Sequence, residues 1–159
     1  MTNSACTTPL THIRPANAFD VSRIAEIIIM NYRQNFYPIF KDEDYYFREL
    51  NVLDMATEYQ EGSDNLNNTY VYDDGVVKGI IRVEGAEIQK LFVEPQFQNQ
   101  HIGEKLLNYV TENLQARYLW VLEYNKSGIA FYERHGFKLT GERVVEDEYV
   151  PLQRMEYVH

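Results

Sequence analysis

Hydrophobic positions near the start of the chain recur at helical spacing. Ile24, Ile28 and Tyr32 stand four residues apart, which places them on one face of a helix. Asp20 precedes this run and is expected to cap the helix, because its short carboxylate can accept hydrogen bonds from the first free amides. A short strand is expected just before it, at residues 12–14.

The next segment predicts a loop and a second helix. Residues 35–40 are expected to form a loop broken by Pro38. A helix should then start at residues 42–44, whose acidic side chains suit the positive end of a helix dipole. The polar residues 62–68 should end it, and its apolar face is expected to contain Tyr46, Leu50 and Leu53.

The middle of the chain changes to the pattern of strands. Residues 69–72 and 76–83 are rich in β-formers and are joined by Asp73-Asp74-Gly75, which predicts a hairpin. A second tight turn at Glu84-Gly85 leads to a strand at 86–93, which Pro95 ends. These short connections predict three antiparallel strands.

The last third alternates between helices and strands. A helix is expected at 102–116, with Leu106, Val110 and Leu114 on its buried face. Residues 118–122 are apolar throughout, as in a central strand covered on both faces. The remaining elements are expected to be a helix at 127–134 and strands at 137–145 and 149–157.

This order of elements predicts an α/β (α+β) fold. Its centre is a mixed, mostly antiparallel sheet of about seven strands with helices on both faces. No repeat or Pro/Ser-rich linker divides the chain, so residues 10–159 are expected to form one domain after a flexible tail at 1–9.

The composition narrows the classes of partner. The chain has 159 residues, with 15 Lys and Arg against 24 Asp and Glu, for a net charge of −9. An acidic surface repels phosphates, so no nucleic acid is expected as a partner, while a cationic one suits it. Hydrophobic residues make up 45% of the chain, which is typical of a packed globular protein rather than a disordered one.

The single cysteine and the N-terminal sequence suggest a compartment. Cys6 has no internal disulfide partner, and no basic start followed by an apolar run marks a secretory signal. The apolar stretch at 24–30 is too short to span a bilayer. We therefore expect a cytoplasmic protein without a membrane partner. The four histidines lack metal-ligand spacing, so no metal is expected.

The segment from Glu87 to Gly103 has the composition of an anion site. It combines a strand, a loop with Pro95 and a glycine just inside a helix start. The first amides of a helix are unpaired and carry partial positive charge, and a glycine lets backbone approach an anion closely. Taken alone, such a glycine more often serves packing than cofactor binding.

A wider pattern extends this segment. The sequence E-I-Q-K-L-F-V-E-P at 87–95 is followed by F-Q-N-Q-H-I-G at 97–103 and a leucine pair at 106–107. It resembles the central motif of the GNAT acetyltransferases, V-x-P followed by Q/R-x-x-G-x-G/A and a Leu-rich helix. Asn125 and A-F-Y-E-R-H-G-F at 130–137 resemble the family's second motif. The resemblance covers about residues 86–140.

The resemblance implies a GNAT-like fold and acetyl-CoA as co-substrate. The pyrophosphate would lie on the backbone amides of residues 99–104, and the pantetheine arm would pair with the strand end like an added strand. His101 replaces the first glycine of the motif, so its side chain either narrows the loop, changes the backbone path or donates to phosphate. The implied coenzyme-binding residues are Leu91, Phe92, Val93, Gln98, Asn99, Gln100, His101, Ile102, Gly103, Glu104 and Asn125.

The chemistry of acetyl transfer needs a base, an oxyanion donor and an acid. Tyr132 stands where GNAT enzymes carry the acid for the departing thiolate, and the resemblance suggests the Val93 amide as oxyanion donor. Glu87 matches the base of one branch of the family, and Glu123 is a rival. The alternatives are that Tyr132 is an ordinary buried aromatic and Glu87 a solvent-exposed strand carboxylate.

The region that covers the acceptor site in this family is aromatic and acidic here. The acids at 42–44 and the aromatics around them suit a cationic amine, but the same residues also fit a packed core and a helix start. The aromatics are Tyr32, Phe36, Tyr37, Phe40, Tyr45, Tyr46 and Phe47.

These observations predict an N-acetyltransferase that transfers acetyl directly to a primary amine in a ternary complex. The acceptor stays open among a polyamine, an amino sugar, an amino acid and a protein N-terminus, and so does homodimerisation. The tail position of Cys6 argues against an acetyl-cysteine intermediate. Two alternatives remain: a non-catalytic acyl-CoA sensor, and transfer to an RNA-borne amine, which the net charge of −9 disfavours.

Overall fold

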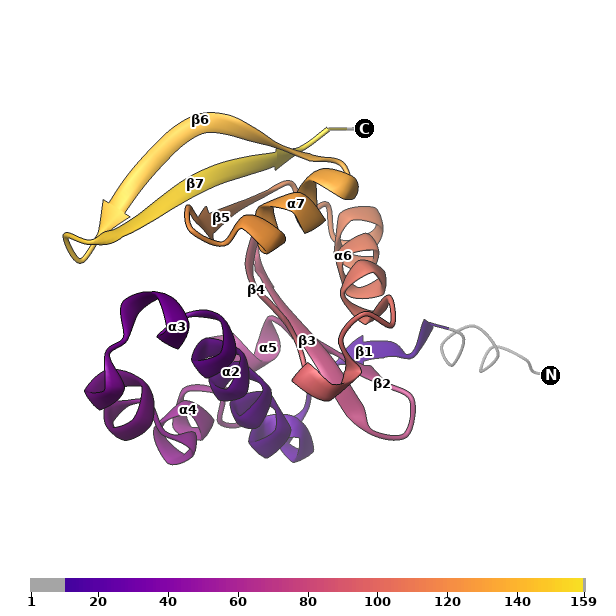
Figure 1. Cartoon of the computed structure of the whole chain (residues 1–159). Helices are drawn as coiled ribbons and strands as arrows, with labels where there is room; N and C mark the ends of the chain where they lie inside the picture. The colour runs from indigo at the N-terminus through magenta and orange to yellow at the C-terminus, as the bar shows by residue number, and fades with distance from the viewer. Residues whose placement is uncertain (1–10, 159) are drawn as a thin grey trace.

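A seven-stranded mixed sheet forms the centre of the protein, in the order β1-β2-β3-β4-β5-β7-β6. The computed structural model describes residues 11–158, so the expected tail and Cys6 lie outside the described residues. Neighbouring strands are antiparallel except β4 and β5, which confirms the mixed, mostly antiparallel sheet (Figure 1). The strands are β1 Ile13–Pro15, β2 Thr69–Asp73, β3 Val77–Glu84, β4 Glu87–Val93, β5 Tyr118–Leu122, β6 Phe137–Glu146 and β7 Val150–Tyr157.

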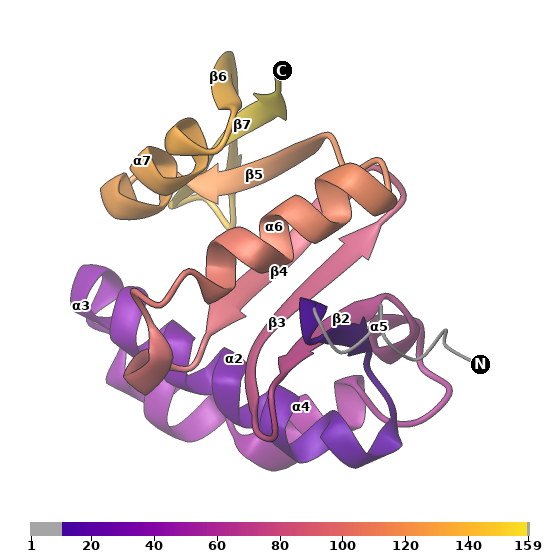
Figure 2. The same cartoon turned by 90° about the vertical axis from the view of Figure 1, so that its right-hand side faces the viewer.

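Helices cover both faces of this sheet, as the sequence predicts. The helices α2 (Val21–Asn35) and α4 (Val52–Glu58) pack on one face, and α6 (Ile102–Asn113) packs on the other with α7 (Lys126–Arg134) beside it (Figure 2). Side chains alternate between the faces along a strand. Ile80 of β3 therefore lies in the core under α2, while its neighbour Ile81 lies in the core under α6.

The hairpin turns follow the glycines that the sequence marks. Gly75 and Gly85 both have positive φ, at 119° and 60°, where a residue with a Cβ is strained. The resulting meander places β4 in the middle of the sheet, with α6 directly after it in the chain.

Residues 36–68 differ from the prediction. The expected loop contains a short helix, α3 (Tyr37–Phe40), because a proline is tolerated in a first helical turn. The expected second helix is divided into a π-helical turn at Tyr45–Glu49 and α4, which Asn51 caps. Leu53 was expected on the buried face but is 80% exposed. The polar run holds a further short helix, α5 (Asp64–Asn67), capped by Ser63.

Asp20 has another role than the predicted cap. Asn17 caps the 3₁₀ turn at Ala18–Asp20, and the Asp20 carboxylate accepts the backbone N–H of Asn17 at 2.8 Å. Arg14 binds the same carboxylate through two donors, at 2.8 and 2.9 Å. Asp20 therefore fixes β1 against the start of α2, and its side chain caps no amide of α2.

Within residues 11–158, no helix is long and apolar enough to cross a membrane. The same residues contain no cluster of three or more His, Cys, Asp or Glu side chains with the arrangement of a metal site.

Candidate active site

The parallel strands β4 and β5 separate soon after they begin. They pair only at Glu87 with Tyr118 and at Ile88 with Leu119. The Glu94 amide donates to the Lys78 carbonyl at 2.8 Å, on the β3 side. Because backbone N–H groups alternate along a strand, the Val93 N–H points to the opposite side, toward the gap beside β5. The end of β4 is thus free to pair with another extended group.

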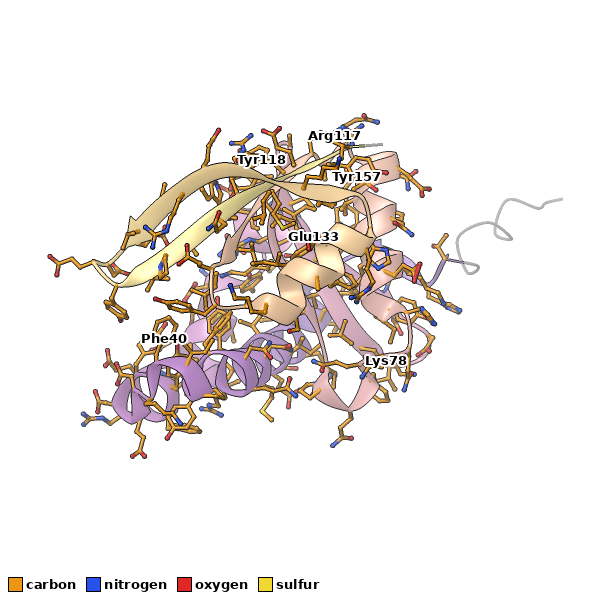
Figure 3. The ribbon with its side chains drawn as sticks, turned by 45° about the horizontal axis from the view of Figure 1, so that its top comes forward. Phe40, Lys78, Arg117, Tyr118, Glu133 and Tyr157 are labelled. Carbon is orange, nitrogen blue, oxygen red and sulfur yellow. The ribbon has the colours of Figure 1, made fainter. Side chains whose placement is uncertain are left out.

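A cavity of about 840 Å³ occupies this gap. Its wall comes from β4 and β5, from α2, α3 and the π-helical turn, and from the tip of the β6–β7 hairpin. Phe40 of α3 belongs to this wall (Figure 3). Its ring contacts the ring of Tyr149, in the β6–β7 turn, edge-on at 5.7 Å between centroids. The cavity brings together the predicted site residues Glu87, Leu91, Phe92, Asn125 and Tyr132.

Tyr132 projects from α7 into the cavity wall. Its ring packs against Phe131 and Phe137, with centroid distances of 5.3 and 5.9 Å. Its hydroxyl makes no hydrogen bond with any residue in 11–158. Burial raises the pKa of Tyr132 to about 12, so the phenol keeps its proton at neutral pH.

The two candidate bases have different surroundings. Glu87 lines the cavity, and one of its oxygens accepts a hydrogen bond from the Gln89 amide at 3.2 Å. Glu123 lies outside the cavity wall and binds Arg143 at 2.7 Å. The Arg143 hydrogen bond lowers the pKa of Glu123, which makes this carboxylate a weaker base. The arrangement favours Glu87.

The loop before α6 contains two non-glycine residues with positive φ, one of which is His101. Asn99 and His101 both have left-handed backbones, with φ of 65° and 67°. The His101 side chain is 78% exposed, with Nδ1 3.1 Å from a Glu104 carboxylate oxygen. The His101 side chain therefore points mostly into solvent, and no side chain caps the first amides of α6.

Gly103 lies at the point where α6, α7 and β4 meet. A Cβ built there would come 3.5 Å from the Phe131 ring and 3.7 Å from a Val93 methyl group. The uncapped first turn of α6 is therefore next to the free end of β4, although the predicted residues from Val93 through Gly103 lie outside the main cavity wall.

Asn31 and Arg23 hold the end of β4, and the sequence reasoning missed both. The buried Asn31 amide donates to the Val93 carbonyl at 3.0 Å, and Gln98 donates to the same oxygen at 3.1 Å. Arg23 binds Glu94 at 3.0 Å. The sequence spacing could have shown that Asn31 is buried, because it follows Ile24 by seven residues and so lies on the same buried face of α2.

Asn125 serves as a helix cap. Its side-chain oxygen accepts the Gly128 amide at 3.0 Å at the start of α7. Its amide nitrogen donates to no residue in the described part of the chain, so it stays available at the cavity wall.

The aromatic cluster divides into two groups. Tyr37 and Phe47 lie outside the main cavity, beside Glu43, Asp44 and Arg48. The others line the cavity together with Asp42, so they serve both packing and the site: Tyr32, Phe36, Phe40, Tyr45 and Tyr46.

Comparison with known proteins agrees with this geometry. Solved structures of N-acetyltransferases share the fold of this chain. The solution structure of apo YjaB from Escherichia coli has a TM-score of 0.70 and 21% identity, covering 92% of this chain and 96% of that one. The PaiA N-acetyltransferase of Thermoplasma acidophilum, solved with coenzyme A, has a TM-score of 0.60 and 19% identity, covering 91% and 98%.

Sequence comparison gives the family. Residues 65–139 match the acetyltransferase (GNAT) domain model, so the chain carries a GNAT acetyltransferase domain, as its motifs predict. An uncharacterized N-acetyltransferase of Methanocaldococcus jannaschii is 39% identical over 67 residues, or 39% of this chain and 30% of the relative. The peptidyl-lysine N-acetyltransferase YjaB of Salmonella typhimurium is 27% identical over 81 residues, or 51% and 56%. The chain thus spans about half or less of the length of these relatives.

Proposed function

We propose that this protein is an acetyl-CoA-dependent N-acetyltransferase that acts by direct transfer to a primary amine in a ternary complex. One observation carries the proposal: β4 and a protonated tyrosine border the gap between β4 and β5, and the uncapped start of α6 lies next to the free end of β4. The GNAT domain match and the coenzyme A in the PaiA structure support acetyl-CoA as the donor.

The residues at this gap fit the coenzyme. Residues 99–104 offer backbone amides at a helix start with no side-chain cap, which suits a pyrophosphate. The Leu91 backbone makes no ladder bond to β5, and the Val93 N–H is free within residues 11–158 although the Val93 carbonyl is bound by Asn31 and Gln98, which suits the amides of a pantetheine arm. The Asn125 amide nitrogen and the Phe92 side chain would complete the contacts. Gln98 acts indirectly, by holding the Val93 carbonyl.

Each catalytic group then has one task. Glu87 lies in the wall of the same cavity, six strand residues or about 20 Å from Val93, so it takes the proton of the acceptor ammonium through a chain of water molecules, and the amine can then attack the thioester carbonyl. The Val93 N–H stabilises the negative charge that develops on the carbonyl oxygen. As the nitrogen–carbon bond forms and the carbon–sulfur bond breaks, Tyr132 gives its proton to the sulfur. The nitrogen loses its remaining extra proton, which returns to the Tyr132 oxygen, and the proton held by Glu87 leaves to the solvent. The products are the acetylated amine and free coenzyme A.

The acceptor side of the cavity supports a cationic amine. Asp42, Glu146 and Asp147 line it together with aromatic rings, which attract and hold an ammonium group. YjaB is called a peptidyl-lysine N-acetyltransferase, so a lysine side chain joins the acceptors worth testing.

A thiol-release assay with acetyl-CoA over a panel of primary amines and peptides tests the proposal. We expect turnover with at least one amine and no acetylated enzyme when acetyl-CoA is added alone. If no amine gives thiol release although coenzyme A binds, the protein is a sensor of acyl-CoA rather than an enzyme.

A further inference from the structure

Lys90 places an ammonium group in the wall of the acceptor cavity. Its Nζ lies 2.5 Å from the Tyr32 hydroxyl and 5.1 Å from the centre of the Tyr32 ring, on the face of β4 that packs against α2. It forms no ion pair with any residue in 11–158. An ammonium that is largely buried without a counter-charge is costly.

A second cation stands directly beside it. Arg82 of β3 is the register partner of Lys90, so two like charges face each other across the strands, an arrangement that is destabilising by itself. Arg82 donates to the Tyr59 hydroxyl at 2.6 Å and to the Gln89 side-chain oxygen at 2.9 Å. Both acceptors are uncharged, and Arg82 has no ion pair within the described residues.

Other arginines of this acidic chain form ion pairs with carboxylates. Arg14, Arg23 and Arg143 each hold one within 3.0 Å. The charges nearest to Lys90 besides Arg82 are Glu58 and Glu146, which act on it from beyond ion-pair distance. Burial, and then the charge of Arg82, lower the pKa of Lys90 to about 8.

We propose that Lys90, supported by Arg82, binds a carboxylate of the acceptor, so that the acceptor is an amine that also carries a carboxylate group. The inference rests on the proposed acetyl transfer. Three strand residues separate Lys90 from Val93, or about 10 Å between their Cα atoms. The amine and the carboxylate of the acceptor are therefore several bonds apart, as in an ω-amino acid.

A matched pair of acceptors tests this inference in the thiol-release assay. Aminohexanoate and aminohexanamide, both with a terminal amine, differ only in the charge at the far end. We expect kcat/KM to be at least about tenfold higher for the acid, mostly through KM. Lys90→Met should remove the preference, and Lys90→Arg should keep most of it. Equal kcat/KM for acid and amide in the unaltered protein would overturn the inference.

A second readout needs no turnover. The ¹³Cε signal of Lys90, assigned with Lys90→Arg, is titrated with pH in the presence of coenzyme A and either N-acetylated acid or N-acetylated amide. The acid should move the pKa of Lys90 from about 8 toward its ordinary value of 10.5, and the amide should not. This shift without any thiol release would leave the carboxylate site standing and reject the transferase. Thiol release without the shift would reject the carboxylate site alone.

Discussion

The proposed donor site at the end of β4 and the proposed acceptor site in its middle offer a ligand different groups. At the end, the Val93 N–H and the first turn of α6 present uncharged amides, and Asn31 and Gln98 hold the Val93 carbonyl through neutral hydrogen bonds. In the middle, Lys90 and its partner Arg82 present charges from side chains on the α2 face. One strand thus carries a backbone site and a side-chain site about three residues apart.

In the proposed function, this difference reconciles an acidic chain with a polyanionic coenzyme. The net charge of −9 matters little where backbone amides make the contacts, because every residue type supplies them. The acceptor site depends instead on which side chains are present. Donor binding should therefore tolerate substitutions that change acceptor choice, and each experiment below separates the two.

The largest effect on the rate of acetyl transfer is expected from Tyr132→Phe, in the wall of the cavity. Losing the acid for the thiolate should lower kcat by about 10²- to 10⁴-fold and leave the affinity for acetyl-CoA nearly unchanged. The hydroxyl has no hydrogen-bond partner within residues 11–158, so the melting temperature should not fall. Tyr124→Phe at an exposed position is the matched control. A full rate for Tyr132→Phe would contradict the assigned role.

Asn31→Ala tests whether the backbone site depends on its supports. The change removes the hydrogen bonds of the buried Asn31 amide to the Ile27 and Val93 carbonyls. The free energy of unfolding should fall by about 1–3 kcal/mol, and the affinity for acetyl-CoA should fall with it. Gln34→Ala, which removes an exposed partner of Gln98, should change stability by less than about 0.5 kcal/mol. Equal losses in chemical denaturation would argue against a specific role for Asn31.

The pH dependence of stability tests the side-chain site. Burial puts the pKa of Lys90 near 8 in the folded protein, below its ordinary value of 10.5. The unfolded chain therefore binds more protons above pH 8, and stability should rise from pH 8 toward 10, by on the order of 1 kcal/mol. Above pH 10 the buried tyrosines Tyr32 and Tyr59, with pKa values raised to about 12, reverse the trend.

Lys90→Met supplies the comparison for that titration. Denaturant unfolding at pH 7, 8, 9 and 10 should show the rise in the unaltered protein and not in Lys90→Met. Parallel curves for the two proteins would show that Lys90 titrates as an ordinary exposed lysine.

The smallest effect is expected from His101→Gly. The left-handed backbone of His101 costs the folded protein about 1 kcal/mol, and a glycine would remove this strain. Glycine also raises the conformational entropy of the unfolded chain, which lowers stability by a similar amount, so the two effects nearly cancel. Stability and coenzyme A affinity should therefore change little, by less than about threefold for affinity. His101→Val should be clearly destabilising, because a β-branched residue tolerates this φ poorly. Calorimetric titration of both variants with coenzyme A decides the matter.

The sequence predicted the regions where local patterns and motifs are strong. The hairpin glycines, the apolar run of β5 and the motif residues around Gly103 led to the sheet and to the GNAT domain. Residues 36–68 were predicted poorly. The segment with Pro38 was expected to be a loop but contains the helix α3, and the expected second helix is divided into a π-helical turn and α4. There Leu53 keeps the spacing of a buried face but is exposed.

The side chains that hold the site were harder to predict, because tertiary contacts decide their roles. Asp20 has the composition of a cap but pairs with Arg14, from another element. Lys90 reads as an ordinary strand lysine until the register with Arg82 is known. The contact of Asn31 with Val93 joins residues 62 positions apart, which no local pattern encodes.

The most direct test of the account is an amide-resolved NMR titration of the protein with acetyl-CoA. We expect saturable shifts at the amides of residues 99–104 and at Leu91 and Val93, with smaller changes at Arg82 and Lys90. Saturation with shifts confined to other elements, or no shift at the start of α6, would contradict it.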